Sequence, residues 1–256
     1  MTLHGIVEQL LIRMTAAQHV TPPRVRLGKL SLGRFPRVVG TLQSQEIDPA
    51  AVVNRKKPAC DIVELRLDQM PSVKNWVKTG LALESADVPV IVTVRLKVEG
   101  GNWKRADKER LPLYDAALTN VSAVDVELRS RIVKRVCGLA KRRGRCCIVS
   151  FHDFEKTPPL DQLKRVAASA QKLGSVIKIV TMLHTKADVA TLRSLLACKW
   201  QKPICVMGMG PLGRKTRIEF PRLGSCLTYG YLDKPAAPGQ SAAPQLIRRL
   251  RRLLVK

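Results

Sequence analysis

Hydrophobic residues along the chain from Arg37 onward follow one repeated pattern. A short run rich in β-branched residues is followed by a turn and then by a stretch whose apolar positions have helical spacing. The pattern predicts strands at residues 37–42, 61–67, 89–95, 122–128, 146–151, 175–180, 203–207 and 224–229. It predicts helices at residues 71–84, 106–118, 130–143, 159–173, 185–197 and 240–254.

Strands that alternate with helices of this length indicate βαβ units and a parallel sheet. Eight such units in a chain of 256 residues favour an α/β fold of the (β/α)8 or TIM barrel type. A doubly wound open sheet is the structural alternative. We expect a single barrel domain over residues 37–256. Residues 1–36 are rich in Thr, Pro and Arg toward their end and are predicted to form a basic, partly extended arm.

Ionisable residues interrupt the apolar alternation of three predicted strands. Glu64 and Arg66 stand between apolar residues in the second strand, Asp125 and Glu127 do so in the fourth, and Lys178 lies between isoleucines in the sixth. Because side chains alternate across a strand, the apolar set should face the helices and the ionisable set the barrel interior. Charges there are costly unless they pair or take part in chemistry.

Further polar residues follow the strands at their carboxyl ends, where barrel enzymes carry their active sites. Arg95 ends the third predicted strand, and His152 with Asp153 follows the fifth. Burial disfavours the charged form of a lysine, so a buried Lys178 would provide an amine able to attack a carbonyl. An edge-strand lysine that prevents aggregation is the plainer alternative for Lys178, and a satisfied polar residue is the alternative for His152.

Composition and charge narrow the picture further. Hydrophobic residues make up 45% of the chain and aromatic residues only 4%, so Val, Leu, Ile and Ala must build the core. The formal net charge of +25 is compatible with a nucleic-acid partner, an anionic membrane surface or an anionic substrate. No stretch approaches 18 uninterrupted apolar residues, so we expect no membrane span.

The seven cysteines include no Cys-x-x-Cys pair. We therefore expect buried, reduced thiols in a cytoplasmic protein, and neither a disulfide framework nor a metal site. The apolar segment at the start of the chain has no basic leader and is interrupted by Glu8 and Gln9, which argues against a secretory signal.

Six motifs of the sequence, taken together, are specific to one enzyme family. They are Glu64-Leu-Arg66-Leu-Asp68; Thr93-Val-Arg95 with Glu99-Gly100-Gly101; Asp125-Val-Glu127-Leu; Ser150-Phe-His152-Asp153-Phe154-Glu-Lys-Thr157-Pro158; Ile-Lys178-Ile; and a C-terminal stretch with Met207-Gly-Met209, Thr216-Arg217, Gly224-Ser225, Thr228-Tyr229-Gly230 and Ala237-Pro238-Gly239-Gln240. On these motifs, residues 37–255 resemble type I 3-dehydroquinate dehydratase, a lyase of the shikimate pathway of aromatic amino acid biosynthesis.

The resemblance implies a homodimeric barrel without cofactor or metal that converts 3-dehydroquinate to 3-dehydroshikimate. It implies that Lys178 forms a Schiff base with the substrate ketone, that His152 acts as general acid and base, and that Glu99 orients His152. The implied substrate contacts are Arg217 and Gln240 on the carboxylate, Glu64, Arg66 and Arg95 on the hydroxyls, and Met207, Met209 and Phe154 on the apolar ring faces. Asp125 and Glu127 are expected to support this set.

Three other functions are compatible with parts of the sequence. The basic clusters at residues 129–145 and 248–256 suit a nucleic acid, although aromatic stacking residues are scarce, and an incidental affinity for polyanions is compatible with them. The sequence Gly208-Met-Gly210-Pro-Leu-Gly213 matches a dinucleotide fingerprint, but Pro221 and the absence of apolar periodicity predict no helix after it. An aldolase would share the lysine but leave His152 unexplained.

The sequence departs from the family pattern at Ala236, where many members carry a serine that helps hold the substrate carboxylate. A hydrogen bond to a charged group is worth about 1.5–3 kcal/mol, so we expect weaker substrate binding with the chemistry intact. The variant Ala236→Ser should therefore lower the Michaelis constant in a steady-state assay. Identical turnover and Michaelis constants in the two proteins would contradict this expectation.

Overall fold

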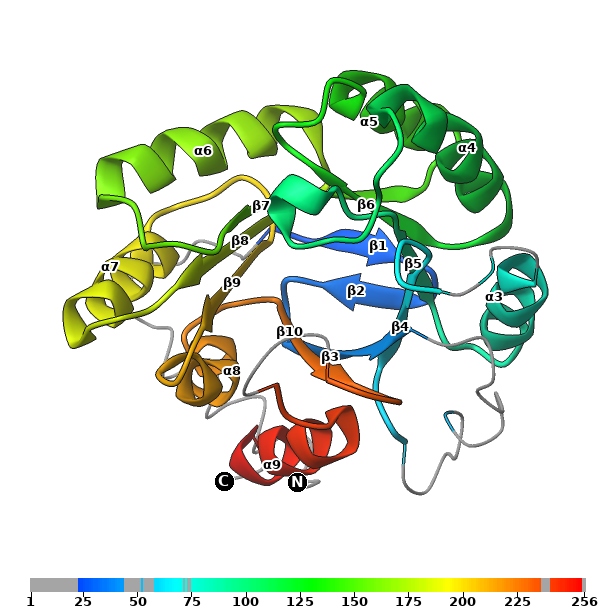
Figure 1. Cartoon of the computed structure of the whole chain (residues 1–256). Coiled ribbons are helices and arrows are strands. Elements are labelled where there is room, and N and C mark those ends of the chain that lie inside the picture. The colour runs from blue at the N-terminus through cyan, green and yellow to red at the C-terminus, as the bar shows by residue number, and fades with distance from the viewer. Residues whose placement is uncertain are drawn as a thin grey trace.

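A computed structural model describes residues 23–43, 52, 58–70, 72, 75–235 and 240–254. Its main sheet is parallel and curves around a central axis (Figure 1). The strands lie in the order β10-β3-β4-β5-β6-β7-β8-β9. Their bounds are β3 (Arg37–Leu42), β4 (Ile62–Arg66), β5 (Val90–Thr93), β6 (Ala123–Glu127), β7 (Cys146–Asp153), β8 (Val176–Met182), β9 (Ile204–Met209) and β10 (Leu227–Tyr231).

The two ends of this sheet meet, so that the eight strands form a nearly closed barrel. At the join, the amide of Cys226 donates a hydrogen bond of 2.8 Å to the carbonyl of Ile204. The predicted (β/α)8 fold is confirmed, and each predicted strand overlaps an observed one. The open doubly wound sheet is excluded by the contact between β9 and β10.

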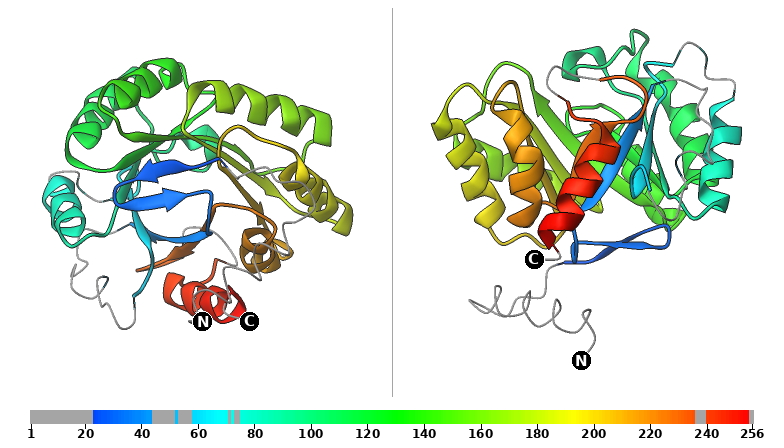
Figure 2. Two further views of the ribbon diagram at one scale, coloured as in Figure 1. Left: turned by 180° about the vertical axis from the view of Figure 1, so that it is seen from behind. Right: turned by 90° about the horizontal axis from the view of Figure 1, so that it is seen from below.

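Helices surround the barrel on its outside (Figures 1 and 2). They are α3 (Trp76–Ser85), α4 (Leu111–Asn120), α5 (Val133–Arg142), α6 (Leu160–Leu173), α7 (Lys186–Ala197), α8 (Gly213–Arg222) and α9 (Ala243–Leu254), with 3-10 turns η1 (Lys97–Glu99) and η2 (Asp107–Arg110). Within the described residues, no helix is both long and apolar enough to cross a bilayer.

The prediction that no helix follows Gly213 is wrong, because α8 begins there. Its buried residues have helical spacing but are not all apolar: Gly213, Thr216, Arg217, Phe220 and Pro221. Pro221 is the penultimate residue of the helix, and a proline supplies no amide to the carbonyl four residues earlier. That carbonyl, on Arg217, instead accepts a 3.0 Å hydrogen bond from the Thr228 hydroxyl. The proline is thereby tolerated.

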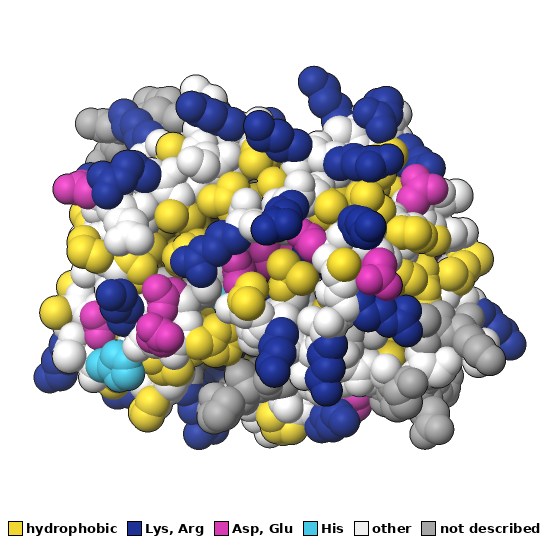
Figure 3. Space-filling model, turned by 45° about the horizontal axis from the view of Figure 1, so that its top comes forward, with side chains coloured by type: hydrophobic (Ala, Val, Ile, Leu, Met, Phe, Trp, Pro, Cys, Tyr) yellow, Lys and Arg dark blue, Asp and Glu magenta, His cyan; other side chains and the backbone are white. Residues whose placement is uncertain are grey.

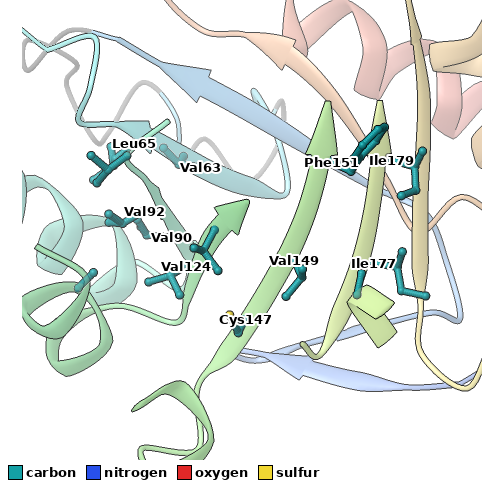
Figure 4. Packing of buried hydrophobic residues seen from close by; sticks show 14 of the residues in the cluster. Val63, Leu65, Val90, Val92, Val124, Cys147, Val149, Phe151, Ile177 and Ile179 are labelled. Carbon is teal, nitrogen blue, oxygen red and sulfur yellow. The ribbon is translucent and has the colours of Figure 1, made fainter. Parts of the chain in front are cut away.

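Most of the core lies between the barrel and the helices. Side chains from alternate positions of neighbouring strands, such as Val63, Leu65, Val124, Ile177 and Ile179, are fully buried in one cluster (Figure 4). This places the ionisable residues between them on the opposite, inner side of each strand, as the alternation predicts. Ile62 is an exception among the apolar residues of β4, because it belongs to a second cluster inside the barrel.

A hairpin closes one end of the barrel (left panel of Figure 2). Strands β1 (Val25–Leu27) and β2 (Leu30–Leu32) pair antiparallel, and the turn between them contains Gly28 at a φ of +57°. Leu27 and Leu32 are fully buried in the inner cluster, against residues from the first halves of the barrel strands. With this end filled, the open space of the barrel lies at the carboxyl ends of the strands. Residues 1–22 of the predicted arm lie outside the described residues.

Candidate active site

A cavity opens at the carboxyl ends of the barrel strands. Eleven predicted site residues line it: Glu64, Arg66, Arg95, Glu99, His152, Phe154, Lys178, Met207, Met209, Arg217 and Gln240. The strand register explains part of this convergence, since Lys178 on β8 pairs with Ser150 on β7 and Cys205 on β9. Asp125 and Glu127 do not line the cavity, but lie fully buried next to residues that do.

Lys178 lies at the floor of the cavity with only 4% of its surface exposed. Its Nζ donates a 2.8 Å hydrogen bond to Asp125 Oδ2 and lies 3.9 Å from Glu64 Oε1. The lysine is paired with acids, and its strand β8 lies between β7 and β9, which rules out the edge-strand interpretation. A buried amine with one face toward a cavity has the position that imine chemistry needs.

Asp125 binds both Arg95 and Lys178 beneath the floor of the cavity. It accepts hydrogen bonds from Arg95 Nη2 at 2.7 Å and from the Ser150 hydroxyl at 2.6 Å, in addition to that from Lys178. Burial alone would raise the pKa of Asp125, but the charges of Arg95 and Lys178 hold it well below its usual range. Asp125 is therefore a permanent anion that compensates two buried cations.

Glu127 and Glu64 complete the buried charge network. Glu127 contacts Arg95 at 3.2 Å and Arg110 at 2.7 Å, and both of its partners are almost completely buried. Glu64 accepts hydrogen bonds from two threonine hydroxyls, Thr41 at 3.1 Å and Thr93 at 2.8 Å. These hydroxyls fix the carboxylate at the wall of the cavity, facing Lys178.

His152 and Glu99 form a second pair at the cavity. Glu99 Oε2 lies 2.9 Å from His152 Nδ1 and also accepts the main-chain amide of His152 at 3.0 Å. Burial, together with the charges of Arg95 and Lys178, lowers the pKa of His152 well below its usual value. The imidazole is therefore neutral at pH 7. Glu99 holds one ring nitrogen, which leaves Nε2 for exchange of a proton with a bound molecule.

Burial also changes the ionisation of Glu99. It raises the pKa of this carboxyl to about 7, even though the charge of Arg95 acts in the opposite direction. A carboxyl that titrates near neutral pH beside a neutral histidine is a typical arrangement for general acid–base chemistry.

Arg217, on α8, is the cation of the cavity best suited to bind an anion. Its guanidinium donates a 2.8 Å hydrogen bond to the carbonyl of Tyr229, and no carboxylate of the described residues lies within ion-pair distance. Burial lowers the pKa of Arg217 to about 10, so the side chain remains cationic at pH 7. A buried arginine without an acidic partner is costly, and a carboxylate of a bound molecule would offset that cost.

The remaining predicted residues surround the mouth of the cavity. Arg66 is held by both carboxylate oxygens of Asp68, at 2.9 and 3.0 Å. Phe154 is 42% exposed and stacks on His152, with 6.4 Å between ring centroids. Its ring leaves no space for a side chain at Gly100, where a Cβ would lie 2.2 Å from Phe154 Cζ. Ala236 lies outside the described residues.

Four residues that line the cavity were not among the predicted site residues: Thr41, Gly100, Val180 and Tyr229. Strand alternation could have identified Thr41 and Tyr229, since both lie at inward positions of β3 and β10. Val180 lies two residues after Lys178 on β8, so alternation predicts its inward direction too, but an apolar residue there does not by itself indicate a site. In the described part of the chain, no group of three or more His, Cys, Asp and Glu side chains is arranged to hold a metal ion.

The glycine motif that resembles a dinucleotide fingerprint does join a strand to a helix, contrary to the prediction. Its glycines allow α8 to approach β9 closely, since a Cβ on Gly213 would lie 2.4 Å from the carbonyl oxygen of Gly208. A Cβ on Gly208 would lie 2.1 Å from a side-chain carbon of Leu183. Packing therefore accounts for both glycines.

The ionisation of Glu99 makes stability depend on pH. Between about pH 4.5 and pH 7 the unfolded chain ionises this carboxyl and the folded chain does not, so its contribution to stability is lost as pH rises through that window. The neutral variant Glu99→Gln avoids the loss. Its free energy of unfolding relative to wild type should rise by about 2–3 kcal/mol across the window, measured by urea denaturation. The exposed Glu155→Gln controls for removal of a charge, and a pH-independent difference for Glu99→Gln would contradict the prediction.

Comparison with known proteins agrees with the site. The family model of type I 3-dehydroquinase matches residues 38–254. The 3-dehydroquinate dehydratase of Methanocella arvoryzae is 31% identical over 84% of this chain and 96% of its own length. That of Methanococcus maripaludis is 38% identical over 70% of this chain and 82% of its own length.

Solved structures give the same result. The type I 3-dehydroquinate dehydratase of Clostridium difficile, crystallised with covalently modified comenic acid, superposes with a TM-score of 0.81 at 25% identity, covering 92% of this chain and 99% of that one. The 3-dehydroquinate dehydratase of Aquifex aeolicus gives a TM-score of 0.72 at 28% identity, covering 84% and 97%. The chain therefore belongs to the type I 3-dehydroquinase family, whose members are hydro-lyases.

Proposed function

We propose that this protein dehydrates 3-dehydroquinate to 3-dehydroshikimate through a Schiff base on Lys178. The observation that carries the proposal is the position of the Lys178 amine on the floor of the cavity, with the His152–Glu99 pair and Arg217 lining the same cavity. Each of these groups matches one requirement of the reaction: a nucleophile, a proton carrier and a site for the substrate carboxylate.

The reaction begins when neutral His152 takes a proton from Lys178 and the freed amine attacks the ketone carbon. The protonated His152 then returns this proton to the carbinolamine hydroxyl, which leaves as water and gives an iminium with Nζ doubly bonded to the former ketone carbon. His152, now neutral again, removes a proton from the neighbouring carbon, and the electron pair moves to the iminium nitrogen to give an enamine. Electrons then return from the enamine and break the bond to the hydroxyl group on the next carbon. The protonated His152 supplies the proton, and the group leaves as water.

The remaining residues bind and orient the substrate. Arg217 and Gln240 hold the carboxylate, while Glu64, Arg66 and Arg95 contact ring hydroxyls from the opposite wall. Met207, Met209 and Phe154 cover the apolar parts of the ring. Glu99 fixes the ring orientation of His152 through Nδ1, and Asp125 with Glu127 keeps Lys178 and Arg95 in place. Hydrolysis of the conjugated iminium releases the product and restores the lysine.

The assignment of the nucleophile can be tested by substitution. Lys178→Met should lower turnover of 3-dehydroquinate by at least about a thousand-fold, because no other amine can replace the missing nucleophile. The ultraviolet absorbance of the conjugated product measures the rate. Lys172→Met, an identical substitution at an exposed position of α6, is the matched control and should retain the wild-type rate. Comparable activity of the Lys178 and Lys172 variants would exclude Lys178 as the nucleophile.

We also propose an incidental affinity for polyanions on the face around α5. Residues 129–145 contain eight basic and no acidic residues. Of these, Arg143 pairs with Asp115 and Arg129 lies over the ring of Phe151. Lys and Arg side chains are widespread on the face of the molecule seen in Figure 3, and Asp and Glu are fewer.

Binding through phosphates alone is governed by counterion release and depends steeply on salt. Duplex DNA should bind with an affinity that falls by about ten-fold or more between 50 and 200 mM salt, measured by fluorescence anisotropy. Arg135→Glu with Arg142→Glu, both exposed, should reduce this salt slope without changing turnover. An affinity independent of salt would contradict an electrostatic interaction.

The proposal also covers the oligomeric state of the protein and its cellular compartment. We propose a homodimer, as the resemblance to the family implies, and sedimentation equilibrium measures the mass directly. The seven cysteines are free thiols, and six of them are buried. Because thiols persist in reducing compartments, we propose that the protein is cytoplasmic, which cell fractionation would test.

A further inference from the structure

One aromatic ring faces the proposed nucleophile. Lys178 Nζ lies 4.0 Å from the centroid of the Tyr229 ring. Tyr229 is at an inward position of β10, is 4% exposed and lines the cavity. At this distance the negative face of the ring attracts a positive charge on the nitrogen, and burial strengthens the attraction because water does not compete.

The ring completes an enclosure around the nitrogen. Asp125 Oδ2 contacts Nζ at 2.8 Å, and Glu64 Oε1 lies 3.9 Å away. Both carboxylates also serve other donors: Asp125 binds Arg95 and Ser150, and Glu64 binds two threonines. Tyr229 is the neutral member of the enclosure, so it can stabilise a cation without binding its proton.

The hydroxyl group of Tyr229 does not explain why a tyrosine occupies this position. It is buried and has no hydrogen-bond partner among the described residues, which is a cost to stability. Burial raises the pKa of Tyr229 well above its usual value, so the side chain remains a neutral phenol. The ring face, rather than the hydroxyl or a phenolate charge, is what contacts the lysine.

We propose that Tyr229 is a catalytic residue whose ring face stabilises the protonated iminium at Lys178 through a cation–π contact. The inference rests on the proposed function, because the iminium exists only if Lys178 condenses with a ketone. After condensation the positive charge stays on the same nitrogen, next to the same ring. A protonated iminium withdraws electrons from the neighbouring carbon far better than a neutral imine, so the contact promotes proton removal by His152.

Removing the ring face tests the contact. Tyr229→Leu keeps an apolar side chain but has no π face, and should lower kcat by about five- to thirty-fold with a smaller change in KM. Tyr229→Phe retains the face and should restore most of the loss. It should also melt at a higher temperature than wild type, because the unpaired hydroxyl is gone. Melting curves of both variants establish that they are folded.

Protonation of the iminium can be read separately from turnover. Cyanoborohydride reduces the protonated iminium and not the neutral imine, so the yield of trapped enzyme at increasing pH reports its titration. In Tyr229→Leu the yield should fall at a pH about one unit lower than in Tyr229→Phe. The groups around this nitrogen are the same in both proteins: Glu64 from β4, Arg95 after β5, Asp125 from β6, His152 from β7 and Cys205 from β9.

Fluorinated phenylalanines at position 229 preserve shape while weakening the ring face. Stepwise fluorination should lower kcat stepwise, and this series decides the question if Tyr229→Leu fails to fold. Equal kcat and equal trapping profiles across the folded variants would overturn the role of Tyr229. If wild type itself is neither trapped nor active with 3-dehydroquinate, the proposed function fails instead, so the two failures are distinguishable.

Discussion

The contact between Asp125 and Lys178 is the interaction on which the site depends. A lysine and an arginine inside a barrel would each cost several kcal/mol if left alone, and removal of one member of such a buried pair typically costs about 3–5 kcal/mol. Asp125 compensates both cations, with 2.8 Å to Lys178 and 2.7 Å to Arg95. The network therefore keeps an amine at the floor of the cavity that could not otherwise remain there.

The residues on the other side of the cavity are not paired with opposite charges in this way. Arg217 and the Glu99–His152 pair are buried without full charge compensation: the arginine has no acidic partner among the described residues, and burial favours the neutral forms of both His152 and Glu99. A buried group without a compensating charge gains a partner, or changes its protonation state, when a charged molecule binds beside it. At the floor of the cavity, ion pairs with Asp125 fix the positions of Lys178 and Arg95. At the wall, a substrate carboxylate would pair with Arg217, and a proton taken from the substrate would charge His152.

Strand periodicity was sufficient to predict the barrel and the inward direction of Glu64, Asp125 and Lys178, because a period of two is visible wherever apolar and ionisable residues alternate. Helix α8 could not be predicted in this way, since its buried face carries Gly213, Thr216 and Arg217. The same limit applied to the site. Strand alternation predicts the charged residues at inward positions as site residues, and it also predicts an inward direction for Tyr229, but alternation alone does not separate an aromatic residue that lines the cavity from one that fills the core. The pairing of Glu99 with His152, 53 residues apart, follows only from the fold.

In the proposed reaction, the nitrogen enclosed by Asp125, Glu64 and Tyr229 becomes covalently bound to the substrate. This bond can be trapped by adding borohydride to the full-length protein during turnover of 3-dehydroquinate and then mapping the peptides by mass spectrometry. We predict a reduced adduct on the peptide that contains Lys178 and on no other lysine, dependent on both substrate and reductant. An enzyme that turns over the substrate without forming this adduct, or that carries it on a different lysine, would contradict the account.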